Sequence, residues 1–260
     1  MSNAVTLVAC VTPGRLPAPD PERPTGAVVI DVLRATTTLA YAFRSGAREA
    51  RFYGTPGSAR RVAARAPVHV LLCGERLGYR ITGFDLGNSP AEYTADRVVG
   101  ATLIFASTNG SRAFLDSKFA DHQWAAGFVN GLAAANTVAS WAAARVAAGA
   151  APRILLVCAG KEGEPALEDS LCAAHLGRLL ESTLGRAGAT AAWSGDRLPP
   201  APTDALHAAH QVRESPHGRY LRSLGPDFVN DVEMCAEWDS VASVPSGSRG
   251  RLSRSEPPAP

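Results

Sequence analysis

The sequence lacks any grouping of cysteine and histidine at metal-binding spacing. Its five cysteines are odd in number and widely separated: Cys10, Cys73, Cys158, Cys172 and Cys235. A dispersed, odd set is typical of reduced thiols and not of a disulfide framework. The pattern therefore argues against a zinc site and favours a cytoplasmic protein.

Long apolar runs and a surplus of one charge are also missing. No segment reaches the roughly 20 apolar residues that a membrane-spanning helix needs, and residues 1–5 carry no basic stretch of a signal peptide. The 26 basic and 24 acidic side chains leave a formal charge of +2, and the basic residues are scattered without interleaved aromatics. We therefore expect neither a membrane nor a nucleic acid as partner.

What the sequence does contain is an alternation of short apolar runs with helical or turn segments. The runs, which are typical of buried strands, lie at residues 5–11, 28–30, 49–53, 68–73, 102–106, 124–129 and 153–157. This alternation predicts a three-layer α/β/α fold with a mainly parallel sheet. The 260 residues suit one domain over 1–245, with or without a second lobe from about residue 186, and a disordered tail over 246–260.

The last third of the chain has a weaker pattern. Short helices are expected at 204–213, 216–224 and 227–237, and Ser215 is a suitable N-terminal cap for the second of them. The apolar residues at 241–245 predict one further strand, at an edge of the sheet. This region carries no motif that points by itself to a chemical function.

The first candidate site lies where the apolar run 28–30 meets a helix. A carboxylate, an arginine and three hydroxyls follow that run: Asp31, Arg34, Thr36, Thr37 and Thr38. At the end of a strand and the start of a helix, these groups supply a metal ligand, an anion contact and free backbone N–H groups. A capped turn with Asp31 and Arg34 as a structural ion pair explains the same residues equally well.

Polar residues also follow the later strands or open the next helix. They are Glu75, Arg76, Asn88, Ser89, Asn109, Gly110, Glu168 and Asp169. Each has an ordinary structural explanation as a turn former or as a helix-start residue favoured by the helix dipole. Because ligands of open α/β sheets bind outside the carboxyl ends of the strands, we expect these residues to converge at one edge.

The order and spacing of these motifs resemble the 2-phosphosulfolactate phosphatase (ComB) family. The motifs are Asp31-Val32-Leu33-Arg34-Ala35-Thr36-Thr37-Thr38, Gly74-Glu75-Arg76, Gly83-Phe84-Asp85-Leu86-Gly87-Asn88-Ser89-Pro90, Thr108-Asn109-Gly110, and Cys158-Ala159-Gly160 with Glu168-Asp169. The resemblance spans residues 28–176, with a weaker similarity at Asp231-Val232 and Val244-Pro245. It implies a ComB-like, Mg²⁺-dependent phosphatase that acts on the phosphate ester of a small 2-hydroxy acid. The implied reaction converts 2-phosphosulfolactate to sulfolactate and phosphate, in coenzyme M biosynthesis where that pathway exists.

The residue types suit phosphate ester hydrolysis. Magnesium prefers oxygen ligands, so Asp31, Glu168 and Asp169 are candidates for metal ligands, and Asp31 and Asp169 also for the catalytic base. Arginine grips anionic oxygens in pairs, so Arg34 and Arg76 are candidates for phosphate binding. The remaining candidates for the phosphate cradle are Thr36, Thr37, Thr38, Asn88, Ser89, Asn109 and Gly110. Glu75 is expected either to orient Arg76 or to act as general acid.

Two known phosphatase mechanisms do not match. An aspartyl-phosphate mechanism of the haloacid dehalogenase type expects an aspartate at the position of Leu33, and a cysteine-phosphate mechanism expects an arginine at the position of Glu164. Attack by water and a covalent intermediate on Asp31 or a threonine both stay open. His217 is a candidate proton donor because histidine titrates near neutral pH, whereas His175 is expected to be structural.

Two other functions fit the same residues. In the first, the chain is a phosphatase for a different small phosphorylated metabolite, such as a sugar or nucleoside phosphate. In the second, the chain is a non-catalytic relative that binds anions. In each case the expected partner is a small anionic molecule, and the chain is compatible with a homodimer.

Overall fold

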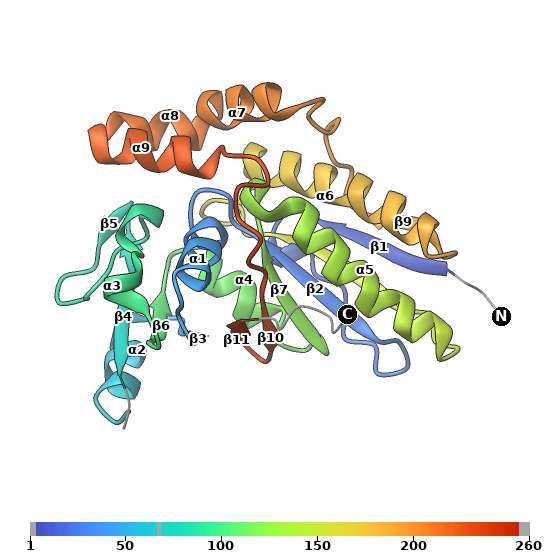
Figure 1. Ribbon diagram of the computed structural model, residues 1–260, viewed down its shortest axis with the longest axis horizontal. Coiled ribbons are helices and arrows are strands. Elements are labelled where there is room, and N and C mark those ends of the chain that lie inside the picture. The colour runs from blue at the N-terminus through green and yellow to red at the C-terminus, as the bar shows by residue number, and fades with distance from the viewer. Residues whose placement is uncertain (1–3, 67–68, 255–260) are drawn as a thin grey trace.

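The computed structural model describes residues 4–66 and 69–254. These residues form an eleven-stranded mixed sheet with helices on its faces (Figure 1). Its strands are β1 (Ala4–Cys10), β2 (Thr25–Ile30), β3 (Glu49–Phe52), β4 (Val70–Arg76), β5 (Tyr79–Arg80), β6 (Thr102–Ala106), β7 (His122–Ala126), β8 (Arg153–Cys158), β9 (Thr190–Gly195), β10 (Pro245–Ser248) and β11 (Arg251–Arg254). They lie in the order β5-β4-β6-β3-β11-β10-β7-β2-β8-β1-β9. Neighbours within β4-β6-β3 and within β7-β2-β8-β1-β9 are parallel, which confirms the predicted α/β fold.

Helices cover both faces of this sheet. They are α1 (Ala35–Arg44), α2 (Pro56–Ala63), α3 (Ala95–Val98), α4 (Gly110–Asp116), α5 (Gly131–Ala147), α6 (Leu167–Arg186), α7 (Ala205–Glu214), α8 (Pro216–Ser223) and α9 (Pro226–Cys235), with single 3₁₀ turns at Pro13–Arg15, Pro90–Glu92 and Phe128–Asn130. Successive side chains of a strand point to opposite faces. Accordingly Val28 and Ile30 pack in the core under α5 and α6, whereas Ala27 and Val29 pack in the core under α1 and α4. The three predicted layers are therefore present.

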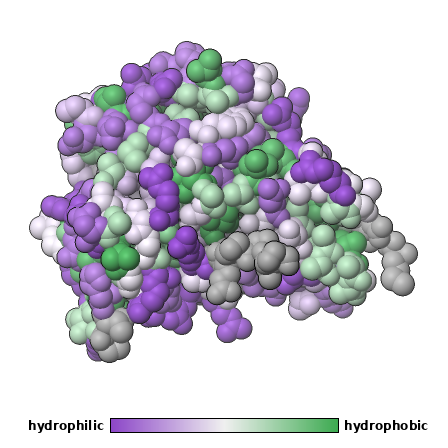
Figure 2. All heavy atoms as spheres, viewed as in Figure 1, coloured by the Kyte–Doolittle hydropathy of each residue, from purple (hydrophilic) through white to green (hydrophobic). Residues whose placement is uncertain are grey.

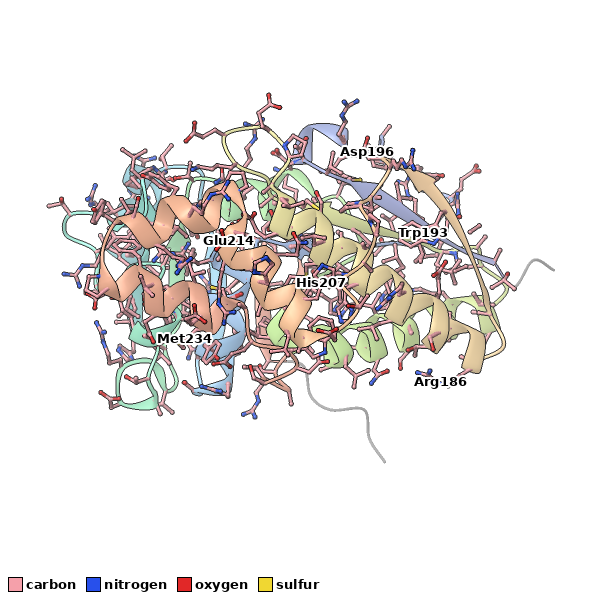
Figure 3. The ribbon with its side chains drawn as sticks, turned by 90° about the horizontal axis from the view of Figure 1, so that it is seen from above. Arg186, Trp193, Asp196, His207, Glu214 and Met234 are labelled. Carbon is pink, nitrogen blue, oxygen red and sulfur yellow. The ribbon has the colours of Figure 1, made fainter. Side chains whose placement is uncertain are left out.

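The helices α7, α8 and α9, called the helical cap below, lie across the end of the sheet where the parallel strands finish (Figure 1). Seen from above, the cap covers one half of the molecule, and α6 extends beside it (Figure 3). Its buried residues Val212, Leu221 and Val232 belong to the same hydrophobic core as β1, β2 and β8. Ser215 caps α8 as predicted, because its Oγ accepts the N–H of Gly218 at 2.9 Å. The cap is therefore packed onto the body of the protein.

The structure corrects the expectation for the residues after 240. Residues 241–244 lie in no strand, and β10 is not at an edge, because it pairs with β7 while β11 pairs with β3. Residues 246–254 belong to this antiparallel hairpin and not to a disordered tail, and residues 255–260 lie outside the described part. The hairpin is rich in serine, glycine and arginine. Its sequence therefore contains almost no apolar pattern that would predict strands. Leu252, fully buried between the two halves of the sheet, is its one strong hydrophobic signal.

The surface in the view of Figure 1 is mostly hydrophilic, with apolar residues in small separate patches (Figure 2). Among residues 4–66 and 69–254, no helix combines the length and the apolar character that crossing a bilayer requires.

Candidate active site

Asp31 is held in the tight turn between β2 and α1. Thr36 closes this turn: its N–H donates to the carbonyl oxygen of Asp31 at 3.1 Å, and its Oγ1 accepts the N–H of Asp31 at 3.0 Å. The side-chain Oδ1 of Asp31 accepts the N–H of Ala35 at 3.3 Å, at the first residue of α1. The strand end and the helix start therefore fix the carboxylate from the main chain.

The Asp31 carboxyl is buried and lies in an acidic setting. Burial raises its pKa to about 6, and the charges of Glu75 and Glu168 push in the same direction. His217 and the N–H of Ala35 oppose that rise in pKa. The electrostatic cost of an ionised Asp31 can be offset by a cation at this site.

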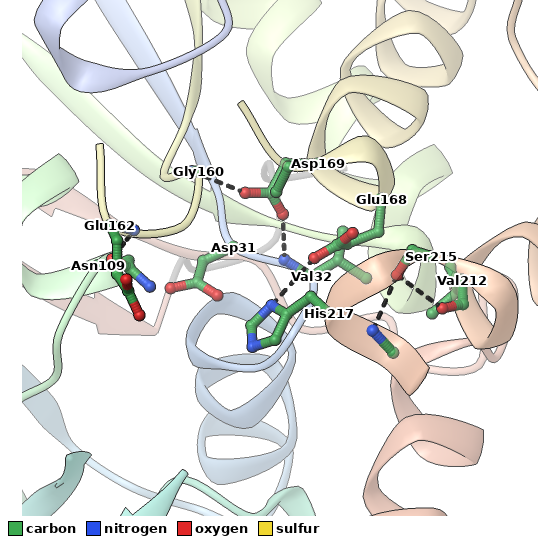
Figure 4. A network of polar contacts seen from close by, with 12 residues as sticks. Asp31, Val32, Asn109, Gly160, Glu162, Glu168, Asp169, Val212, Ser215 and His217 are labelled. Carbon is green, nitrogen blue, oxygen red and sulfur yellow. Dashed lines mark hydrogen bonds and ion pairs between the residues drawn. The ribbon is translucent and has the colours of Figure 1, made fainter. Parts of the chain in front are cut away.

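Asp169, in the first turn of α6, joins two strand-end loops (Figure 4). Its Oδ1 accepts the N–H of Val32 at 2.8 Å, and its Oδ2 accepts the N–H of Gly160 at 3.0 Å. Burial, followed by the charges of Asp31 and Glu168, raises the pKa of Asp169 well above its ordinary value. The structure thus brings the three predicted acidic residues together, with Asp169 as the one bonded to the main chain through both oxygens.

Glu168 contacts a histidine from the helical cap. Its Oε1 lies 3.1 Å from Nδ1 of His217, at the start of α8 (Figure 4). Its Oε2 is buried and has no hydrogen-bond partner within the described residues. A buried, unpartnered carboxylate oxygen needs a donor or a cation, which a bound ligand can supply.

Asp31 and His217 line a narrow cavity of about 30 Å³, whereas Glu168 and Asp169 are not among its lining residues. Its lining comes from the turn after β2, the β4–β5 hairpin, two further loops and the cap: Asp31, Leu33, Arg34, Glu75, Gly78, Asn88, Asn109, His217 and Leu221. Five of the predicted site residues therefore meet here, together with His217. The open space is large enough for a water molecule or an ion.

The hydroxyls of residues 36–38 have structural roles in this arrangement. Thr37 Oγ1 donates to the carbonyl of Val32 at 3.0 Å, and Thr38 Oγ1 donates to the carbonyl of Asn88 at 3.0 Å. Thr36 bonds within the Asp31 turn, and all three threonines are fully buried. The hydroxyls therefore hold the loops that carry the site, and a contact of these residues with phosphate stays a prediction.

Glu75 and Arg76 separate at the end of β4. The carboxylate of Glu75 lines the cavity and accepts the N–H of Thr108 at 2.8 Å and the N–H of Gly78 at 3.0 Å. Arg76 donates to the main-chain carbonyl of Glu75 at 2.8 Å and does not line the described cavity. Because β-strand side chains alternate, the residue after Glu75 points away from the site. The structure does not bring Arg76 to the other candidates.

Asn109 and Gly110 lie opposite Asp31. Asn109 Oδ1 accepts the N–H of Glu162 at 3.1 Å, which ties the loop after β6 to the loop after β8 (Figure 4). A Cβ at Gly110 would lie 2.5 Å from Oδ2 of Asp31, so only glycine permits this close approach. The Oδ1 of Asn88, on a third loop, is buried and unpartnered in the part of the chain described here.

The structural explanation of this turn predicted an ion pair between Arg34 and Asp31. Arg34 does not form that pair. Its guanidinium forms an ion pair with Asp231 of α9 and donates to the carbonyl of Gly78 at 2.5 Å. The ring of Phe228, also on α9, lies 5.0 Å from the guanidinium carbon. Ser89 Oγ donates to the other oxygen of Asp231 at 2.5 Å. From the sequence, Asp231 stands out only as part of a weak similarity to the family, and its role was not predicted because a buried acid on a short helix has no local signature.

A second cavity of about 370 Å³ continues from the first beneath α9. The two share Arg34, Gly78 and Asn88. Two further arginines line the larger cavity, Arg80 and Arg97, and both donate to the carbonyl of Asp85 at 3.3 Å. Arg97 also forms an exposed ion pair with Glu92, at 4.0 Å. The larger cavity can hold a small anionic molecule with one end at Arg34.

The cysteines take no part in this chemistry. All five are free and buried, and burial raises the pKa of Cys158, at the end of β8, well above its usual range. A buried thiol with a raised pKa is a poor nucleophile at neutral pH. This agrees with the mismatch of the sequence to a cysteine-phosphate mechanism.

The fold is that of an α/β protein whose candidate active site lies at the carboxyl edge of a parallel sheet. The sequence profile described as 2-phosphosulpholactate phosphatase matches residues 10–250. A protein of Synechococcus sp. (strain CC9605), named "Probable 2-phosphosulfolactate phosphatase", is 38% identical over 243 residues, which cover 89% of this chain and 93% of that protein. A protein of Prochlorococcus marinus (strain MIT 9313) with the same name is 35% identical over 236 residues, covering 87% and 90%. The chain belongs to the 2-phosphosulfolactate phosphatase family, and it is a phosphoric monoester hydrolase.

Proposed function

We propose that this chain hydrolyses the phosphate ester of a small 2-hydroxy acid, with 2-phosphosulfolactate as the substrate and sulfolactate and phosphate as products. The observation that carries the proposal is the meeting of buried carboxylates, Arg34 and His217 around one cavity, in a chain of this family. Hydrolysis of such an ester requires that the phosphate charge is neutralised and that the leaving alkoxide receives a proton. The cavity offers groups for both tasks.

Arg34 is the group that we assign to the phosphate. It lies where the narrow cavity meets the larger one, so a phosphate at this junction has its ester bond close to the carboxylates and the rest of the molecule in the larger cavity. A guanidinium carries five N–H donors and binds phosphate oxygens in pairs. Arg80 and Arg97 are then available for the carboxylate and the sulfonate of the substrate.

His217 is the group that we assign to the leaving oxygen. Its Nδ1 is occupied by Glu168, which leaves Nε2 as the nitrogen that can give a proton to the alkoxide. Glu168 fixes the orientation of the ring in this role. Asp169 maintains the geometry from behind, since it joins the loops after β2 and β8.

Magnesium is part of the proposal, and the site offers carboxylate oxygens for it. Within the described residues, no three side chains of histidine, cysteine, aspartate or glutamate group closely enough to hold a metal ion. Magnesium commonly uses one or two carboxylates and completes its shell with waters and substrate phosphate. The unpartnered Oε2 of Glu168 and the carboxylate of Asp31 fit this smaller set and would hold the ion. A bound Mg²⁺ would offset the charge of the phosphate and of the buried acids.

The test is phosphate release from a panel of esters: 2-phosphosulfolactate, 2-phospholactate, 2-phosphoglycerate and several nucleoside monophosphates, each with Mg²⁺ and with EDTA. We expect Mg²⁺-dependent turnover confined to the esters of 2-hydroxy acids. Selective turnover of a sugar or nucleoside phosphate would replace the substrate, and no turnover by folded protein would overturn the proposal. The pathway of coenzyme M, the cytoplasmic location and a homodimeric state stay predictions.

A further inference from the structure

Asp231 is a buried acid outside the group of carboxylates around Asp31. It lies in the middle of α9 and is 2% exposed. One of its oxygens accepts from the guanidinium of Arg34, and the other accepts the hydroxyl of Ser89 at 2.5 Å. Both oxygens are therefore used to hold residues that come from the body of the protein.

Arg34 is held on a second side as well. Its Nη2 donates to the carbonyl of Gly78, and the N–H of Gly78 donates to the carboxylate of Glu75 at 3.0 Å. The ring of Phe228, one turn before Asp231 on α9, covers the guanidinium. The two bonds to Asp231 and Gly78 use two of the five N–H donors of an arginine, and the side chain lines both cavities. Donors thus remain for an anion in those cavities.

We propose that Asp231 is a positioning residue, which fixes the guanidinium of Arg34 at the junction of the two cavities so that its remaining donors grip the phosphate of the substrate. The inference rests on the proposed function, because it assumes that Arg34 binds the phosphate of the substrate. In this arrangement the helical cap completes the site through Asp231. A flexible arginine loses side-chain entropy when it binds an anion. An arginine that is already held in place has lost this entropy before the anion binds.

The charge of Asp231, taken alone, predicts the opposite effect on phosphate affinity from the one that positioning predicts. A carboxylate next to an anion site repels the anion, so removal of its charge should tighten phosphate binding. Positioning predicts that the same removal weakens binding, because the guanidinium is released from its fixed orientation. The sign of the change in phosphate affinity therefore separates the two explanations.

The experiment measures orthophosphate binding by calorimetry in the presence of Mg²⁺, alongside kcat and KM for 2-phosphosulfolactate. The variants are Asp231→Asn, Arg34→Lys and the double variant, and the matched control is Glu233→Gln. Glu233 lies on the same helix and also pairs with an arginine, Arg213, at 2.8 Å, but does not line either cavity. We expect Asp231→Asn to weaken phosphate binding about tenfold, in the range for a lost charged hydrogen bond, and Glu233→Gln to leave it unchanged.

The double variant shows whether Asp231 acts through Arg34. If it does, Asp231→Asn adds nothing further to the loss in the Arg34→Lys background. Equal or tighter phosphate binding by Asp231→Asn, or the same loss in both backgrounds, would overturn the inference. Should Asp231→Asn fail to fold, Ser89→Ala removes the other bond to Asp231 without a change of charge, and unchanged phosphate affinity in that variant would overturn it as well. Failure of the proposed function itself would appear in the wild-type protein, as absence of turnover.

Discussion

The cavity has two walls that are built in different ways. On the sheet wall, Asp31 and Glu75 accept main-chain N–H groups from the loops around them, and Asp169, outside the lining, does the same for two of these loops. On the cap wall, His217 and Asp231 reach the site through side chains alone. The sheet wall is fixed as soon as the parallel strands are paired, whereas the cap wall adds single contacts that can be removed one at a time.

Function and stability are coupled differently on the two walls. Side-chain contacts across the cap can be changed with little effect on the main chain of the sheet, so cap variants should show graded losses of activity in a folded protein. Changes on the sheet wall should act on the reacting centre itself. The following variants test this contrast.

Asp31→Asn should have the largest effect. The carboxylate that we propose as a Mg²⁺ ligand is lost while the turn keeps its shape, so we expect kcat to fall about a thousandfold, as is typical when charge stabilisation at the reacting centre is lost. Its unfolding temperature should be at least that of the wild type, because a buried charge is removed. Steady-state kinetics and thermal unfolding measure both. A near-normal rate would remove Asp31 from the mechanism.

His217→Gln should lower kcat for 2-phosphosulfolactate about a hundredfold, the lower end of the range for general acid catalysis. The loss should be much smaller for 4-nitrophenyl phosphate, since its leaving group needs no proton. His210→Gln, at an exposed position of α7, is the control and should behave as wild type. Equal losses on the two esters would show that His217 is not the proton donor.

The double variant Arg80→Gln/Arg97→Gln tests the larger cavity. We expect KM for 2-phosphosulfolactate to rise about tenfold, as for lost hydrogen bonds to a charged group, with kcat almost unchanged. For a simple alkyl phosphate, which has no further anionic group, KM should stay the same. Arg61→Gln, on the exposed side of α2, is the control. An equal rise in KM for both esters would contradict a role in selecting the acidic part of the substrate.

His175→Phe should affect stability and leave activity unchanged. Burial lowers the pKa of His175 from 6.5 to about 4, and the ring packs against Trp238 with 4.1 Å between centroids. The unfolded chain therefore takes up a proton below pH 6.5 that the folded protein refuses, so stability is lost as pH falls from 6.5 to 4. At about 1.4 kcal/mol per pKa unit, this loss is at most about 3.5 kcal/mol. Urea unfolding at several pH values should show that the free energy of unfolding falls less steeply toward acid pH in the variant than in the wild type. The same fall in both proteins would contradict the assignment.

Much of the sheet wall could be predicted from the sequence, and most of the cap wall could not. Asp31, Glu168 and Asp169 follow apolar runs, and parallel strands bring their carboxyl ends to one edge whatever the detailed topology. Asp231 lies on a short helix, where a polar residue that faces inward looks the same as one that faces water. The partner of Arg34 is 197 positions away in sequence, and no local pattern encodes such a pairing. The sequence left two roles open for residues 36–38, because a hydroxyl near a helix start suits a backbone bond as well as a phosphate.

The β10–β11 hairpin also bears on how the protein avoids aggregation. It is the only link by strand pairing, within the described residues, between the β4-β6-β3 part of the sheet and the β7-β2-β8-β1-β9 part. Until residues 245–254 are in place, β3 and β7 each present an open row of backbone N–H and C=O groups, which can pair with another molecule. A folding chain therefore exposes two adhesive strand edges until a short serine- and glycine-rich segment closes them.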